Sequence, residues 1–181
     1  MKVDLRSDTV TVPSKDMLEF MMDSNVGDDV YGEDPTVNQL QNKVASIFGK
    51  DVGMFFPSGT MANQTAIKLH TNPGEQVICD KYSHIYNYEG GGASFNSGVS
   101  FNLINGERGM FNAKQAADSI NPKDFYHSPL SSLIAVENTT NKGGGDCWNI
   151  NELKQIKKIA KLNNLLMHLD VDRIWNDLVE N

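Results

Sequence analysis

Apolar and polar residues alternate along this chain with two periods, one typical of helices and one typical of short buried strands. The clearest helical period follows Asp34, a capping residue, with Pro35 in the first turn and Gly49 at the end. Its apolar residues fall on one face: Val37, Leu40, Val44, Ile47 and Phe48. Similar patterns predict further helices over residues 14–22, 61–70, 112–120 and 150–162.

Short apolar runs predict strands at residues 52–56, 76–79, 132–136 and 165–169, and the alternation of Val99, Phe101 and Leu103 predicts another at 99–103. Asn72-Pro73-Gly74 predicts a turn, whereas Asn105-Gly106 either closes a hairpin or begins a loop. The glycine triplets at 90–92 and 143–145 are loops or places of close approach. Because strands and helices alternate, we expect an α/β fold with a mostly parallel sheet flanked by helices.

Composition adds few functional hints. The chain has 181 residues, a net charge of -7 and 39% hydrophobic residues, which fits one large domain spanning 1–181. The acidic balance argues against a nucleic-acid or anionic-membrane partner, and we read the basic residues at 154–161 as a solvated helix face. The two cysteines form no metal cluster, and Cys79 is expected to be a buried core thiol. We expect a cytoplasmic protein, since no apolar run approaches membrane-spanning length.

Polar residues follow several predicted strands, and in parallel α/β sheets ligands lie outside the carboxyl ends of the strands. The residues in question are Ser58-Gly59-Thr60, Asp80, His84, Glu137, Asn138, Asp170 and Arg173. The Ser58 turn precedes a helix, so its backbone N–H groups could bind a phosphate. Asp170 could pair with a protonated ring nitrogen. No GxGxxG or GxxxxGK[ST] motif supports a dinucleotide or P-loop site.

Each of these signals also has a structural reading. The Ser58 turn alone is more often a simple helix cap, and a plain nucleotide-binding module resting on it is a weak alternative. Asp170 could cap a helix or pair with Arg173. His84 alone would more often be a hydrogen-bonded, partly buried histidine. His127 lies in a polar loop before a strand, and His168 inside an apolar strand reads as structural.

The order of the motifs resembles the low-specificity L-threonine aldolases, in the β-eliminating lyase group of fold-type-I pyridoxal-phosphate enzymes. The resemblance rests on residues 4–11, 26–36, 57–64, 77–80 and 83–85, and continues through 88–91, 97–99, 137–139 and 168–170. It implies a large domain of that fold, with an N-terminal arm over about residues 1–35. It also implies a homo-oligomer, with Tyr31 and its acidic loop near a subunit interface.

The resemblance implies roles for individual residues. Ser58, Gly59 and Thr60 would bind the phosphate of pyridoxal 5'-phosphate. His84 would stack on its ring, and Asp170 would keep the ring nitrogen protonated. Arg173 and Ser7 would bind the substrate carboxylate, and His127 would lie near the substrate hydroxyl, whose proton a base removes. The implied reaction cleaves β-hydroxy amino acids such as L-threonine to glycine and an aldehyde.

The sequence departs from the family at several positions. Val171 and Asp172 replace the usual Gly-Ala, and Thr140 replaces a histidine. The family's Schiff-base lysine is expected a few dozen residues after Asp170, beyond Asn181, and the C-terminal small domain is absent from this sequence. We therefore expect little activity from the chain alone. The alternative is an inert remnant that binds cofactor weakly or serves as an association module.

Overall fold

The computed structural model describes residues 3–4, 6–175 and 178. The chain divides into two compact units, Met1–Phe55 and Phe56–Asn181, and each is described by itself. The first unit contains the short 3-10 helix η1 (Asp8–Val10) and the helices α1 (Lys15–Asp23) and α2 (Pro35–Ile47). Of its described residues, only Ala45 is buried. This unit therefore has almost no core of its own.

The cap predicted at Asp34 is confirmed, and Ser14 caps the helix before it. The Ser14 side chain accepts a hydrogen bond from the Met17 N–H at the start of α1. Asp34 accepts from the N–H groups of Thr36 and Val37 at the start of α2. These side chains satisfy backbone donors that have no partner inside a helix, which explains why the helices begin there.

The strand predicted at residues 52–56 is wrong. This segment has no strand geometry, and Val52 and Met54 are 80% and 73% exposed. The Phe55 N–H donates to the Gln41 side chain of α2 at 2.9 Å instead of to a neighbouring strand. A short apolar run becomes a buried strand only where another strand completes its hydrogen bonds, and among the described residues none does.

Within its described residues, the second unit contains a four-stranded sheet in the order β2-β1-β3-β4. The strands are β1 (Gln76–Asp80), β2 (Ser100–Ile104), β3 (Ser131–Glu137) and β4 (Leu166–Asp170). All paired strands are parallel, so the predicted fold class is confirmed. Asn105-Gly106 therefore begins a loop and closes no hairpin. The central strands β1 and β3 are almost fully buried, as expected for strands covered on both faces.

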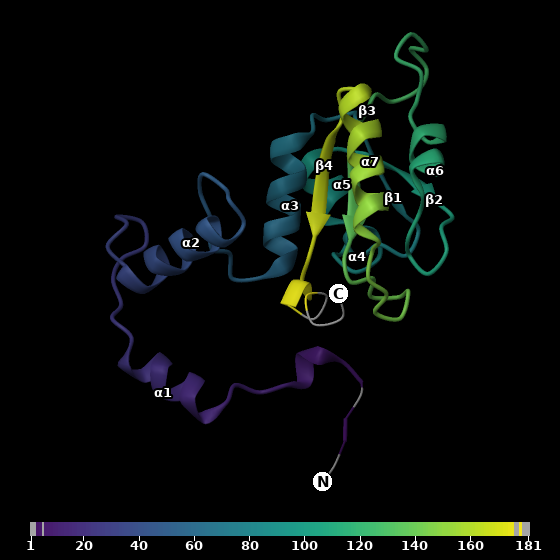
Figure 1. The fold of residues 1–181 in the computed structure, drawn as a ribbon. Helices are drawn as coiled ribbons and strands as arrows, with labels where there is room; N and C mark the ends of the chain where they lie inside the picture. The colour runs from purple at the N-terminus through teal and green to yellow at the C-terminus, as the bar shows by residue number, and fades with distance from the viewer. Residues whose placement is uncertain (1–2, 5, 176–177, 179–181) are drawn as a thin grey trace. The chain divides into compact units, whose positions relative to one another are not determined.

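Helices cover both faces of the sheet (Figure 1). They are α3 (Gly59–His70), α4 (His84–Asn87), α5 (Gly92–Ser97), α6 (Ala113–Asp118) and α7 (Ile150–Leu162). One core cluster joins Ile67 of α3 and Ala93 of α5 to the sheet, and another joins Ala116 of α6 and Ile156 of α7 to it. The sequence did not predict α4 and α5, because both helices are too short to show an apolar period.

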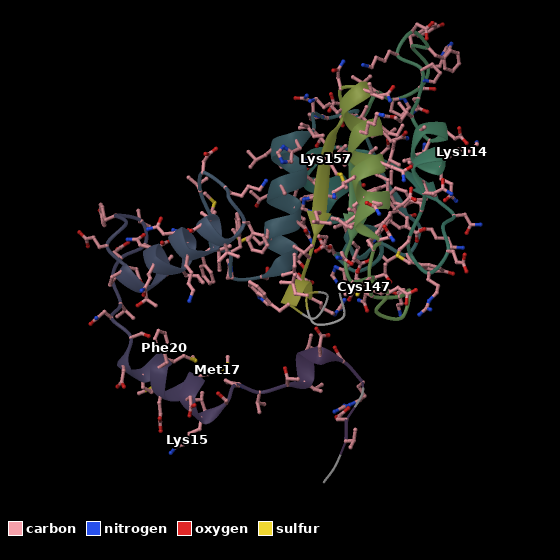
Figure 2. All side chains as sticks on the ribbon, in the orientation of Figure 1. Lys15, Met17, Phe20, Lys114, Cys147 and Lys157 are labelled. Atoms are coloured by element: carbon pink, nitrogen blue, oxygen red, sulfur yellow. The ribbon has the colours of Figure 1, made fainter. Side chains whose placement is uncertain are left out.

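One glycine of each triplet lies where another group approaches closely, as expected. A Cβ at Gly92 would lie 2.0 Å from the Gln64 side chain, and one at Gly143 would lie 1.8 Å from the Arg108 carbonyl oxygen. The basic residues of α7 lie on a solvated face as predicted, and Lys157 of α7 and Lys114 of α6, both labelled in Figure 2, are exposed. In the described ranges, no helix has both the length and the apolar composition needed to cross a bilayer.

Candidate functional site

The carboxyl ends of β3 and β4 bring buried carboxylates to one edge of the sheet. Glu137 ends β3 and is in register with Asp170, which ends β4. Both side chains are buried, at 9% and 7% exposure. The start of α3 lies at the same end of the unit as the arrowhead of β4 (Figure 1). The edge predicted for ligand binding therefore carries both Asp170 and the Ser58-Gly59-Thr60 turn.

The side-chain amide of Asn63 in α3 joins three polar side chains at this edge by hydrogen bonds. Asn63 Nδ2 donates to Glu89 Oε1 at 2.9 Å and to Asp170 Oδ2 at 3.1 Å. His168 Nε2 lies 2.9 Å from Asn63 Oδ1. Since an amide oxygen only accepts, His168 must carry its proton on Nε2. Burial lowers the pKa of His168 to about 4, which keeps it a neutral donor, so its structural role agrees with the sequence interpretation.

The electrostatics of the edge favour a positively charged ligand. Burial, together with the nearby carboxylates of Asp172 and Glu137, raises the pKa of Asp170 to about 7. Burial also raises the pKa of Glu137, against the hydrogen bond from the Asn141 N–H and the charges of His84 and Arg173. A cation beside Asp170 would reverse this penalty, because it stabilises the ionised carboxylate.

His84 is held at this edge by Glu89. Its Nδ1 lies 3.3 Å from Glu89 Oε1, and its ring centroid lies 5.6 Å from that of Tyr88. The Glu89 side chain is fully buried, and its Oε2 has no hydrogen-bond partner among the described residues. The same is true of Thr140 Oγ1, at the position where the sequence departs from the family. Unsatisfied buried oxygens are rare, and a bound ligand or water is a common explanation for them.

Arg173 lies just beyond β4 and donates from Nη1 to the Thr139 carbonyl oxygen at 3.1 Å. The loop that carries Thr139 is anchored by Trp148, whose Nε1 donates to the Glu137 carbonyl oxygen at 2.9 Å. Arg173 is half-buried, so its guanidinium adds positive charge beside the carboxylates. The structure therefore brings Arg173, His84 and Asp170 to one region, as the sequence predicted.

The Ser58-Gly59-Thr60 turn has the backbone of an anion site. Ser58 caps α3 by accepting from the Met61 N–H at 3.2 Å, which leaves the N–H groups of Gly59 and Thr60 without an intrahelical partner. However, Asp172 lies against this turn. A Cβ added at Gly59 would lie 3.2 Å from Asp172 Oδ1, so a carboxylate lies beside the turn that was predicted to bind the phosphate.

The structure does not bring His127 to this edge. His127 is exposed in the loop before β3, next to Tyr126 at a ring-centroid distance of 3.9 Å. Glu137 lies at the other end of β3, and seven extended residues separate the two ends of this strand by about 20 Å. A residue that precedes a parallel strand lies at the opposite end of the sheet from residues that follow it. Within one chain, His127 is therefore too far from Asp170 to share a ligand with it.

Ser7 belongs to the first unit, where its hydroxyl lies 2.8 Å from Thr9 Oγ1. Its predicted role at the substrate carboxylate stays a prediction. A groove of about 790 Å³ lies elsewhere in the second unit, between the loop after β2 and the start of α7, and includes Arg108 and Trp148. Its lining does not contain Asp170 or His84, so its size does not mark the site that the charges indicate.

Comparison with known proteins places the chain in a family. The model of the beta-eliminating lyase family matches residues 4–180. The chain belongs to that family. Within the family it is 40% identical over 178 residues to the low specificity L-threonine aldolase of Escherichia coli K12, covering 98% of the chain and 52% of the relative. It is 38% identical over 177 residues to the low-specificity L-threonine aldolase 1 of Arabidopsis thaliana, covering 96% and 49%.

Among solved structures, a threonine aldolase of Leishmania major matches this beta-eliminating lyase family member with a TM-score of 0.76 at 23% identity. That match covers 90% of the chain and 46% of the solved one, and it supports the fold alone. The chain spans about half the length of the curated relatives it matches.

Sequence reasoning missed Asn63 and Glu89, the residues that join His84 to Asp170. Both are buried polar residues, at 5% and 6% exposure. A signal for Asn63 was available in the sequence. It lies one turn after Gly59 and on the same buried face of α3 as Ile67. A polar residue on the inward face of a helix requires a partner, but the sequence alone does not say which one.

Proposed function

We propose that this chain forms the pyridoxal-phosphate-binding part of a lyase that cleaves β-hydroxy amino acids such as L-threonine into glycine and an aldehyde. The observation that carries the proposal is the buried Asp170, with its raised pKa, at the ligand edge of a parallel sheet. The family membership and the names of the relatives support the same reaction.

The residues around Asp170 fit the ring of this cofactor. A protonated ring nitrogen would supply the cation that the buried carboxylates lack, and Asn63 would hold Asp170 Oδ2 so that Oδ1 faces the ring. His84, oriented by Glu89, would contact the ring face. When bound, pyridoxal phosphate supplies an electron sink for bond cleavage at the amino acid.

The remaining roles concern the phosphate and the substrate. The N–H groups of Gly59 and Thr60 would hold the phosphate, with the positive end of α3 behind them. Arg173 would bind the substrate carboxylate, and Ser7 is proposed to assist it. His127 is proposed as the group near the substrate hydroxyl only where it comes from another copy of the chain, since its own Asp170 is out of reach.

Cofactor binding is tested by titrating the chain with pyridoxal phosphate. We expect saturable binding that is at least ten-fold weaker in Asp170→Asn, which removes the charge partner of the ring nitrogen. Gly59→Val should also weaken binding, because its side chain would fill the space over the N–H groups. Lys142→Ala is the matched control and should bind as the parent does, since Lys142 is exposed and lies over the Tyr88 ring at 5.2 Å. Equal affinity in all four proteins would refute the proposed site.

Lyase activity is tested by acetaldehyde release from L-threonine in the presence of pyridoxal phosphate, measured against the cofactor alone. Release above this background that disappears in Asp170→Ala would support the reaction. Tight cofactor binding without any release would limit the function of this chain to binding.

We also propose that the chain associates with further copies of itself, in the cytoplasm. In α1, Met17 and Phe20 are 58% and 66% exposed, and both are labelled in Figure 2. Exposed apolar residues of this kind are commonly covered in an assembly. Light scattering at micromolar concentration should show dimers or larger species, and a sharp monomer peak would contradict the proposal.

A further inference from the structure

Asp172 is the residue of the candidate site that does not match its proposed ligand. The three atoms nearest to a Cβ at Gly59 all belong to the Asp172 carboxylate, at 3.2, 3.8 and 3.9 Å. The side chain that approaches Gly59 from outside its own helix is therefore a charged one. Asp172 is exposed to solvent.

A carboxylate and a phosphate compete for the same features of the turn. Both are attracted by the N-terminal end of α3 and by its free N–H groups, and they repel each other at short distance. The other acidic groups of the edge, Asp170 and Glu137, lie near the ring-binding part. Asp172 is the carboxylate that lies next to Gly59 itself.

We infer that Asp172 acts as a specificity residue that weakens the binding of the ligand's phosphate group, so that this site discriminates poorly between phosphorylated and phosphate-free forms of the same ring. The inference rests on the proposed function, because it takes the Gly59 turn as the phosphate site. Its structural alternative is that Asp172 stabilises the start of α3 and has no effect on ligands.

The test compares pyridoxamine 5'-phosphate with pyridoxamine, which share a ring and differ only in the phosphate. Neither has an aldehyde, so neither reacts with surface lysines. Binding of both is measured by calorimetry at low salt for the parent chain, Asp172→Asn and Asp124→Asn. Asp124 is exposed in the loop at the opposite end of the sheet, so its replacement removes the same charge far from the turn.

In Asp172→Asn, the ratio of the affinity for pyridoxamine phosphate to that for pyridoxamine should rise about ten-fold, which corresponds to about 1.4 kcal/mol. The ratio is the readout because the charge of Asp172 also acts on Asp170, which would hold the ring of both ligands. Raising the salt concentration should shrink the gain, since exposed charges are screened. Asp124→Asn should leave both affinities unchanged.

The outcomes separate the inference from the function on which it rests. If both ligands bind and their affinity ratio is the same in the parent and in Asp172→Asn, the inference is overturned while the cofactor site stands. If only the thermal stability changes in Asp172→Asn, the residue is a helix cap and the inference is again overturned. If neither ligand binds any of the proteins, the proposed function fails and the inference fails with it.

Discussion

Replacing Asp170 by Asn should stabilise the chain and, at the same time, weaken its cofactor site. The buried carboxylate has its pKa raised from 3.8 to about 7, so ionising it in the folded state costs about 4 kcal/mol relative to water. Asparagine has nearly the same shape, carries no charge, and can still accept the hydrogen bond that Asn63 Nδ2 donates at 3.1 Å. The substitution removes the penalty and keeps the contact.

The size of the stability gain depends on pH. Below about pH 3.8 the carboxyl is protonated in both the folded and the unfolded state, so the two proteins should be equally stable. As pH rises, the unfolded state ionises first, and the parent loses stability until the folded carboxyl also ionises near pH 7. At pH 8 we expect Asp170→Asn to exceed the parent by about 2 to 4 kcal/mol in free energy of unfolding.

The assay is urea unfolding, followed by circular dichroism, at intervals from pH 4 to pH 8. The control is Asp80→Asn, in a buried carboxylate that accepts from the Tyr82 and Gly106 N–H groups at 2.8 and 2.9 Å. That variant should be less stable than the parent by about 1–3 kcal/mol. The NH₂ group of the asparagine would replace one carboxylate oxygen, so one of the two backbone N–H donors would lose its acceptor. The reasoning is refuted if Asp170→Asn is no more stable than the parent at pH 8, or if any gain is the same at all pH values.

Three further measurements follow from the buried groups of the second unit. His168 should not titrate between pH 5 and pH 8 in nuclear magnetic resonance spectra of the folded chain, because burial holds its pKa at about 4; a midpoint near 6.5 would contradict the effect of burial on this ring. Cys79, whose pKa burial raises to about 12, should react with a thiol reagent only after unfolding, whereas the partly exposed Cys147 should react in the folded state. Trp148→Phe should lower the free energy of unfolding by about 2 kcal/mol, since it leaves the Glu137 carbonyl oxygen without its 2.9 Å donor; unchanged urea midpoints would show that this bond is not important.

The sequence by itself determined the elements whose signals are local. The α7 helix has the predicted bounds of residues 150–162, and α2 begins at the cap supplied by Asp34, because apolar period and capping depend on neighbours a few residues apart. The four strands of the sheet lie within a few residues of their predicted positions. The central strands β1 and β3 are apolar runs because both of their faces are covered. The resemblance to the family added the residues that could hold a cofactor, and Asp170 lies at the predicted sheet edge.

Tertiary structure decided which of those residues meet. The run at 52–56 is apolar but exposed, because pairing requires a second strand that no local pattern specifies. His127 lies at the far end of the sheet, because it precedes its strand and does not follow it. The amide of Asn63 joins Asp170 to Glu89 across 107 and 26 residues of sequence. These contacts, and the pKa of Asp170 that results from them, depend on distances between distant segments, and such distances exist only once the chain has folded.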